Sequence, residues 1–116
     1  MTECRRGDIY MAALDTDRFC ESIQEGTRPV LVVSNDRCNA NSPVITAVPF
    51  TSRRRKKRLP THVIVLGCGL PKPSVALAEQ IMTLNKGRLE RRMGSIRDTA
   101  YEAEVDKAIK IQLSVH

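Results

Sequence analysis

Short runs of β-branched and other apolar residues, separated by turn-forming residues, constrain the fold of this chain more than any other feature. The clearest run is RPVLVVSN at 28–35, whose continuous apolar character predicts a strand that is buried on both faces. We predict strands at 8–14, 28–35, 43–51, 62–66, 74–84 and 93–97. Short strands at this spacing, followed by a helix, predict one mainly β domain of the α+β class over residues 1–116, built as a small, strongly curved barrel.

The segments between and after these strands carry helix and turn signals. Asp98 is predicted to cap a C-terminal helix, because Tyr101, Val105 and Ile109 recur at helical spacing after it. The last residues, IKIQLSV, also alternate as a strand would, and we predict that they remain helical. The segment NKGRLE favours a short helical turn, the segment DRCNANS has turn chemistry, and residues 15–27 form a long polar loop.

A run of six cations at 53–58 is the strongest functional signal. The net charge is +6, from 19 Lys and Arg against 13 Asp and Glu, so these six residues account for the whole imbalance. Adjacent like charges repel one another, so the run is predicted to be an extended loop between two strands. A solubilising loop and a nuclear import signal are alternatives, but such a local excess of cations favours binding to nucleic-acid phosphates.

The remaining composition narrows the functional class. Aromatic residues make up only 3% of the chain and Trp is absent, so a base-stacking platform is poorly supplied. The four cysteines are widely spaced and contain no C-x-x-C motif, which argues against a zinc site. The N-terminus lacks the apolar stretch of a secretory signal, and no run is long enough to span a bilayer. We therefore expect reduced thiols, a cytoplasmic protein and no membrane association.

Several polar residues at predicted strand ends are candidate site residues, each with a structural alternative. Arg28 precedes a buried strand and must meet an anion or solvent, and an ion pair with Glu25 or Asp8 would suffice. Thr51 and Ser52 end the strand before the cations, where hydroxyls often only stabilise a turn.

Other polar residues complete this set. His62 begins the next strand, and a histidine in such a place is more often structural than functional. Glu79 and Gln80 interrupt an apolar strand, so they lie either on its solvent face or in a site. A catalytic pair of histidines is improbable because the other, His116, ends the chain.

Taken in order, the motifs resemble those of the MazF/PemK toxin family. The resemblance rests on GDIY, GTRPVLVVSND at 26–36 with Asn39, VPFTS at 48–52, LPTHV at 59–63, SVALAEQIMTL at 74–84 and EVDKAIKIQL at 104–113. It implies an SH3-like β-barrel with a C-terminal helix, a homodimer, and a bacterial toxin whose cognate antitoxin blocks the RNA groove with a disordered C-terminal segment. It also implies a sequence-specific endoribonuclease, an mRNA interferase, that cuts single-stranded RNA and inhibits translation and growth.

The resemblance assigns roles to individual residues. The catalytic Arg and Thr of the family match Arg28 and Thr51, and no metal or cofactor is implied. Cleavage would proceed by attack of the neighbouring 2′-OH, leaving a 2′,3′-cyclic phosphate and a 5′-OH. RNA-binding residues are predicted as Gln24, Ser52, Arg53, Arg54, Arg55, Lys56, Lys57, Arg58, His62 and Gln80.

The first long loop departs from the family pattern. Where the family has S-E-Q-G-G, this chain has Ser22, Ile23, Gln24, Glu25 and Gly26, and the loop is slightly longer. The RNA sequence that is cut is therefore not given by the resemblance. Two alternative functions share the barrel: a toxin that poisons DNA gyrase, as the CcdB toxins do, and an RNA-binding barrel without catalysis. The first needs neither Arg28 nor Thr51, and the second does not need Arg28.

Overall fold

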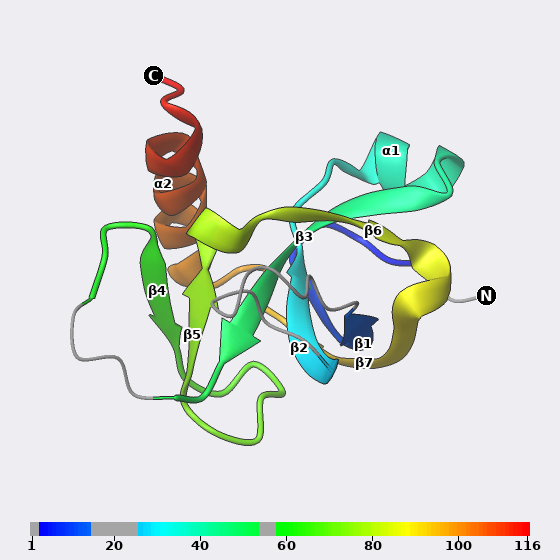
Figure 1. Ribbon diagram of the computed structural model, residues 1–116, viewed down its shortest axis with the longest axis horizontal. Helices are drawn as coiled ribbons and strands as arrows, with labels where there is room; N and C mark the ends of the chain where they lie inside the picture. Colours follow the sequence, from blue (N-terminus) through cyan, green and yellow to red (C-terminus); the bar gives the residue numbers. More distant parts are fainter. Residues whose placement is uncertain (1–2, 15–25, 54–57) are drawn as a thin grey trace.

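The strands form one curved antiparallel sheet with a helix against one side (Figure 1). The computed structural model describes residues 3–14, 26–53 and 58–116. In chain order the elements are β1 (Asp8–Leu14), β2 (Gly26–Val32), α1 (Asp36–Asn41), β3 (Val44–Thr51), β4 (His62–Val65), β5 (Ser74–Leu77), the 3₁₀ helix η1 (Ala78–Gln80), β6 (Met82–Asn85), the 3₁₀ helix η2 (Lys86–Arg88), β7 (Leu89–Ser95) and α2 (Tyr101–Leu113). The predicted mainly β fold with a C-terminal helix is confirmed.

The strand order is β4-β5-β3-β2-β1-β7, and β6 also pairs with β3. Strand β3 is therefore bound along both edges. β2 lies on one edge, while β5 and β6 share the other, at the end and at the start of β3 respectively. Among the described residues the strand path does not close, because no ladder joins β4 to β7.

The prediction of one strand over 74–84 is wrong, because the chain bends at η1 between β5 and β6. The backbone N–H of Ala78 donates to the carbonyl of Thr61 at 3.0 Å, and the Glu79 carboxylate binds the side chains of Thr61 and His62. These long-range bonds turn the chain away from β5. The bend allows β5 to pair with the end of β3 and β6 to pair with its start, which curls the sheet.

The strand predicted over 28–35 is β2, which spans Gly26–Val32, and its burial on both faces is confirmed for Val30, Leu31 and Val32. Leu31 packs in the core between the sheet and α2, together with Phe50 and Val105. Its neighbour Val30 points to the opposite face and packs with Tyr10 in a second apolar cluster. Since both faces of the strand meet apolar side chains, its continuous Val and Leu run is explained.

The helix α2 presents the predicted stripe to the sheet. Val105 and Ala108 are buried, and Tyr101 and Ile109 pack at the edge of the same core. The hydroxyl oxygen of Tyr101 also accepts the backbone N–H of Leu66 at 3.1 Å. The C-terminal segment remains helical to Leu113, as predicted.

The predicted cap of this helix is wrong. Asp98 lies outside the helix in a left-handed conformation with φ of 63°, and its backbone N–H donates to Glu102 Oε1 at 2.7 Å. The hydroxyl of Thr99 instead accepts the backbone N–H of Tyr101 at 3.2 Å. Asp98 therefore belongs to the turn that leads into the helix, and α2 begins three residues after it.

Two further boundaries differ from the sequence predictions. The segment predicted as a turn forms the short helix α1, because Asn35 Oδ1 accepts the backbone N–H of Cys38 at 2.8 Å as an N-cap. Strand β7 begins at Leu89 and ends at Ser95, earlier than the predicted 93–97. The short helical turn predicted just before it is confirmed as η2.

The turn after β4 rests directly on β7, where two glycine backbones meet. A Cβ on Gly69 would lie 2.0 Å from the Met93 carbonyl oxygen, and a Cβ on Gly94 would lie 2.0 Å from that of Cys68. Gly69 also has a φ of 92°, which side chains disfavour. The two ends of the strand path thus come together through backbone packing, without a hydrogen-bonded ladder.

We expect Gly94→Ala to destabilise the fold strongly, because no flexible side chain can move to relieve the overlap with Cys68. Overpacking of this kind costs about 1–3 kcal/mol, and a clash with backbone belongs at the upper end of that range. Urea denaturation would measure the change. Thr83→Ala, on the exposed side of β6, is the control and should shift stability by no more than about 0.5 kcal/mol. Equal stability of the two variants would contradict the packing argument.

Candidate active site

The two residues predicted to be catalytic lie at adjoining ends of β2 and β3. These strands pair antiparallel, with Val30 opposite Pro49 as the last pair of the ladder. If this register is extended by two residues beyond Val30 and Pro49, Arg28 comes to lie across from Thr51. Arg28 is half-buried, whereas Thr51 is only 3% exposed. The ladder itself stops at Val30 and Pro49, so the two residues lie just beyond its end on neighbouring strands.

The hydroxyl of Thr51 is held in place by the turn that follows it. Its Oγ1 accepts the backbone N–H of Arg53 at 3.2 Å, and its backbone pairs with Val75 of β5. A hydroxyl can accept one hydrogen bond while donating another. The bond from Arg53 therefore fixes the oxygen and leaves the hydroxyl proton for an acceptor.

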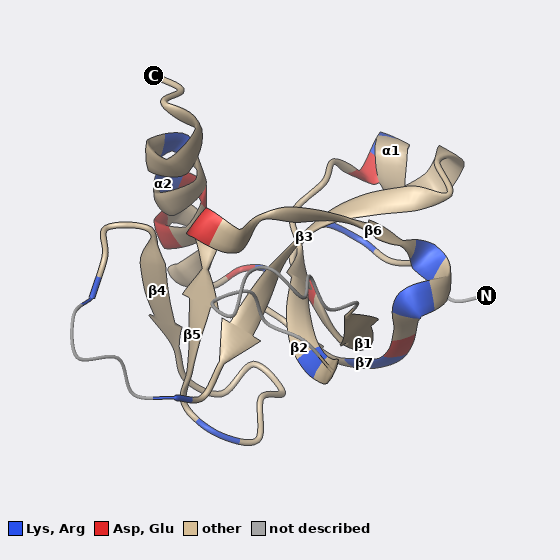
Figure 2. Cartoon of the chain, in the orientation of Figure 1, with Lys and Arg blue, Asp and Glu red and all other residues tan. Residues whose placement is uncertain are grey.

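A pocket of about 190 Å³ opens at this end of the sheet and is lined by Arg28 and Ser52. Its other lining residues are Met11, Pro29, Phe50, Pro71, Lys72 and Ser74. Thr51 is not among them. Figure 2 shows basic positions at the start of β2, just after β3 and in the turn between β4 and β5. The Ser74 hydroxyl donates to the Lys72 carbonyl at 2.9 Å, so two cations and the Ser52 hydroxyl, over apolar side chains, make a site suited to an anion.

Lys72 is a site residue that the sequence reasoning missed. It lies between Pro71 and Pro73 in the turn before β5, far from the basic run. A lone lysine in a polar turn carries little signal by itself. Only the pairing of β5 with the end of β3 brings this turn to the pocket that contains Arg28.

The basic run is described only at its two ends. Arg53 and Arg58 are exposed, whereas 54–57, with Arg54, Arg55, Lys56 and Lys57, lie outside the described residues. The predicted Gln24 also lies outside them. Gln80 is half-buried at the end of η1.

His62 lies in the interior, with a side chain only 2% exposed. Its Nδ1 accepts the backbone N–H of Leu59 at 3.1 Å, so the ring proton belongs on Nε2, which lies 2.7 Å from Glu79 Oε2. The hydroxyl of Thr61 donates to Glu79 Oε1 at 2.9 Å. Both ring nitrogens are therefore engaged, and the imidazole does not face the pocket of Arg28.

Glu79 titrates below its ordinary range despite its partial burial. Burial by itself raises its pKa, but the hydrogen bonds from His62, from a backbone N–H and from Thr61 act in the opposite direction and together prevail. The net pKa of Glu79 is lowered, so the carboxylate is ionised at neutral pH.

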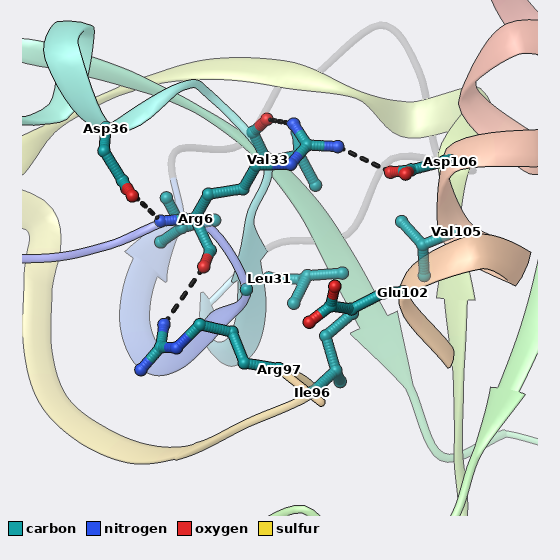
Figure 3. Close-up of a pocket in the computed structure, with 11 residues that line it drawn as sticks. Arg6, Leu31, Val33, Asp36, Ile96, Arg97, Glu102, Val105 and Asp106 are labelled. Carbon is teal, nitrogen blue, oxygen red and sulfur yellow. Dashed lines mark hydrogen bonds and ion pairs between the residues drawn. The ribbon is translucent and has the colours of Figure 1, made fainter. Parts of the chain in front are cut away.

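A second pocket, of about 240 Å³, lies between the sheet and α2 and is drawn in Figure 3. Its charged groups bind one another. The Arg6 guanidinium bonds to the Val33 carbonyl and to Asp106 of α2, and Asp36 accepts the backbone N–H of Arg6 at 2.7 Å. Arg97 donates to the Arg6 carbonyl at 3.0 Å. This pocket contains neither Arg28 nor Thr51, and the Arg6–Asp106 ion pair attaches α2 to the N-terminal segment.

Three other sequence expectations concern metals, membranes and thiols. In the described part of the chain, no group of three His, Cys, Asp or Glu side chains could hold a metal ion. No helix there is long and apolar enough to cross a bilayer. Cys4, Cys38 and Cys68 are free thiols, while Cys20 lies outside the described residues.

We expect Glu79→Gln to destabilise the protein at neutral pH by about 1.5–3 kcal/mol, the usual value of a hydrogen bond to a charged group. The introduced amide has only one oxygen, so its NH₂ group would face either the Thr61 hydroxyl or His62 Nε2, both of which are donors. Because the folded pKa of Glu79 lies below its unfolded pKa, its stabilising effect is complete above the unfolded pKa and is lost as pH falls through the folded pKa. The difference in unfolding free energy between wild type and variant should therefore shrink in acid. Glu90→Gln, on the exposed part of β7, controls for the lost charge.

Comparison with known proteins assigns a family to this architecture. Residues 5–113 match the family described as the PemK-like, MazF-like toxin of type II toxin–antitoxin systems. A curated relative, Endoribonuclease MazF of Staphylococcus saprophyticus, is 40% identical over 114 residues, which cover 97% of this chain and 92% of the relative.

Solved structures share the fold over nearly the full length. An endoribonuclease in complex with its cognate antitoxin from a mycobacterial species has a TM-score of 0.77 and 27% identity, with 97% of each chain covered. MazF from Deinococcus radiodurans also has a TM-score of 0.77, covering 98% of this chain and 99% of its own, and at 23% identity it supports the fold alone. With a family match over nearly the whole length and a relative at 40% identity, this chain belongs to the PemK-like, MazF-like toxin family of type II toxin–antitoxin systems.

Proposed function

We propose that this endoribonuclease toxin cuts single-stranded RNA at the adjoining ends of β2 and β3, with Arg28 and Thr51 acting on the scissile phosphate. The observation that supports the proposal is the β2–β3 register, which, if extended two residues beyond its last pair, sets Arg28 across from Thr51, next to a cationic pocket that Arg28 lines. In the proposed reaction the 2′-OH oxygen attacks the neighbouring phosphorus and the bond to the 5′-oxygen breaks. The products are a 2′,3′-cyclic phosphate and a 5′-OH, which requires no metal.

Arg28 is assigned to charge stabilisation. An arginine keeps its proton at any physiological pH, so it cannot act as a general base. Its planar guanidinium can donate two parallel hydrogen bonds to the non-bridging oxygens, where negative charge grows as the phosphorane forms. Thr51 can donate its hydroxyl proton to the same phosphate, because the bond from the Arg53 backbone occupies only a lone pair of Oγ1.

Phosphates on either side of the cut are assigned to the other cations. Arg53 leads directly from Thr51 into the basic run, and Lys72 approaches the pocket from the turn before β5. For a single strand, each neutralised phosphate contributes about −0.7 to the slope of log K against log salt. Ser52, Gln80, Gln24 and the cations 54–58 remain assigned to RNA binding. His62 is not, because its ring is buried and both nitrogens are bound.

Two protein partners are also proposed: a second copy of the chain and a cognate antitoxin. One structural relative is named as an endoribonuclease in complex with its cognate antitoxin. The second copy is supported by exposed apolar side chains in or just after β4 and α2, which a lone barrel would leave in water. They are Ile64, Leu66, Ile111, Leu113 and Val115.

Arg28→Ala should lower the rate of RNA cleavage by about 10²–10³-fold, the usual loss for one donor to a developing oxyanion. Cleavage of a long unstructured RNA would be followed in EDTA, with the fragment ends mapped for cyclic phosphates. RNA binding should persist, since other cations hold the strand. Arg37→Ala removes an exposed arginine from α1 and serves as the matched control.

The alternatives give different results in this experiment. Cleavage at the wild-type rate by Arg28→Ala would show that Arg28 has no catalytic role. Binding without any cleavage by the wild type would indicate an RNA-binding barrel. A wild type that neither binds nor cuts RNA would favour a gyrase poison.

The isolated protein should sediment as a dimer at micromolar concentration, because association removes exposed leucine and isoleucine side chains from water. Analytical ultracentrifugation in 0.15 M salt would measure its mass. The relevant mass of one chain is 13.0 kDa. A single species of that mass across the concentration range would contradict the proposal.

A further inference from the structure

We infer that Glu79, acting through His62, is a positioning residue that holds the C-terminal end of the basic run in place for RNA. The inference rests on the proposed function, and it assigns to both residues a role other than contact with the substrate. It is carried by a chain of hydrogen bonds that runs from η1 through the buried imidazole to the backbone next to Arg58.

Both described ends of the run are held by side-chain acceptors. At the first end, Thr51 Oγ1 accepts the backbone N–H of Arg53 at 3.2 Å. At the second end, His62 Nδ1 accepts the backbone N–H of Leu59 at 3.1 Å. The carbonyl of Leu59 also accepts the backbone N–H of His62 at 3.0 Å, so two bonds close the turn that directly follows Arg58.

Glu79 selects the form of His62 that can make this turn. A neutral imidazole has one donor and one acceptor nitrogen, and only an unprotonated Nδ1 can accept from Leu59. The carboxylate, 2.7 Å from Nε2, places the proton on that nitrogen. Thr61 Oγ1 donates to the other carboxylate oxygen at 2.9 Å and keeps the carboxylate oriented.

A fixed end matters because adjacent cations repel one another. If the turn at Leu59 opened, Arg58 would occupy many positions, and binding RNA would then require loss of that freedom. The chemistry should be spared, because Arg28 is paired with Ala12 of β1 and Thr51 with Val75 of β5, away from the turn at Leu59. The device should therefore affect binding of RNA and leave the cleavage step unchanged.

Two substitutions of His62 separate positioning from simple stability. In His62→Asn, the side-chain oxygen takes the place of Nδ1 and can still accept from Leu59. In His62→Gln, the side-chain amide takes the place of Nε2 and can still donate to Glu79, but the acceptor for Leu59 is lost. Both variants remove ring volume from a buried site, so both should lose thermal stability, which is measured first.

The binding probe is a fluorescent pool of mixed-sequence single-stranded RNA, 2′-fluoro at every sugar, so that the attacking hydroxyl is absent. His62→Gln should raise Kd about five- to tenfold, the usual effect of losing one charge-assisted contact. His62→Asn should stay within about twofold of wild type. The salt slope of His62→Gln should also be shallower by about 0.7, as expected for one lost phosphate contact. On ordinary RNA, kcat should be unchanged in His62→Gln while KM rises.

The outcomes distinguish this inference from the proposed function. Equal Kd values and salt slopes for the Asn and Gln variants would overturn it, as would a fall in kcat with unchanged KM. A wild type that binds the probe but does not cut ordinary RNA would overturn the proposed cleavage. In that case the difference in Kd between the two variants would still support or overturn the positioning role.

Discussion

Strand β3 is the element on which the rest of the structure depends, because its backbone must be hydrogen-bonded along both edges. β2 serves one edge, and β5 and β6 divide the other. This requirement forces the chain to bend between β5 and β6, and the bend curls the sheet. At the end of β3, Thr51 pairs with Val75 near the start of β5, and the β2–β3 ladder ends two residues short of Arg28.

Several arginines outside the basic run form ion pairs with acidic side chains of the same chain. The buried Asp8 carboxylate accepts from Arg97 at 2.6 Å and from Arg92 at 3.3 Å, while Arg6 binds Asp106. These arginines join the N-terminal segment to β7 and α2, and their charges are neutralised locally. Asp8, one of the two ion-pair partners considered for Arg28, is thus engaged elsewhere. In contrast, the basic run contains no acidic residue of its own.

Local sequence pattern predicted most of the strands, the helix stripe and the buried nature of β2, because these follow from periodicity alone. The errors arose where contacts with residues distant in the sequence determine the local structure. The strand predicted over 74–84 breaks because Glu79 meets Thr61 and His62, which no local pattern shows. The short helix α1 could have been found, since Asn35 is a favourable N-cap. Lys72 had no local signal, and its place near Arg28 follows only from strand order.

The family resemblance supplied Arg28 and Thr51 as a pair, and the sheet register gives that pair a physical basis. Of the two histidines, His62 has both ring nitrogens in hydrogen bonds and His116 is the last residue of the chain. His62 is therefore not placed to exchange protons with a substrate beside Arg28. The proposed reaction must therefore gain most of its rate from fixed positive charge and oriented donors around the phosphate. Such a site works only if its donors are already in place, and in the proposed site the ends of β2 and β3 would hold them.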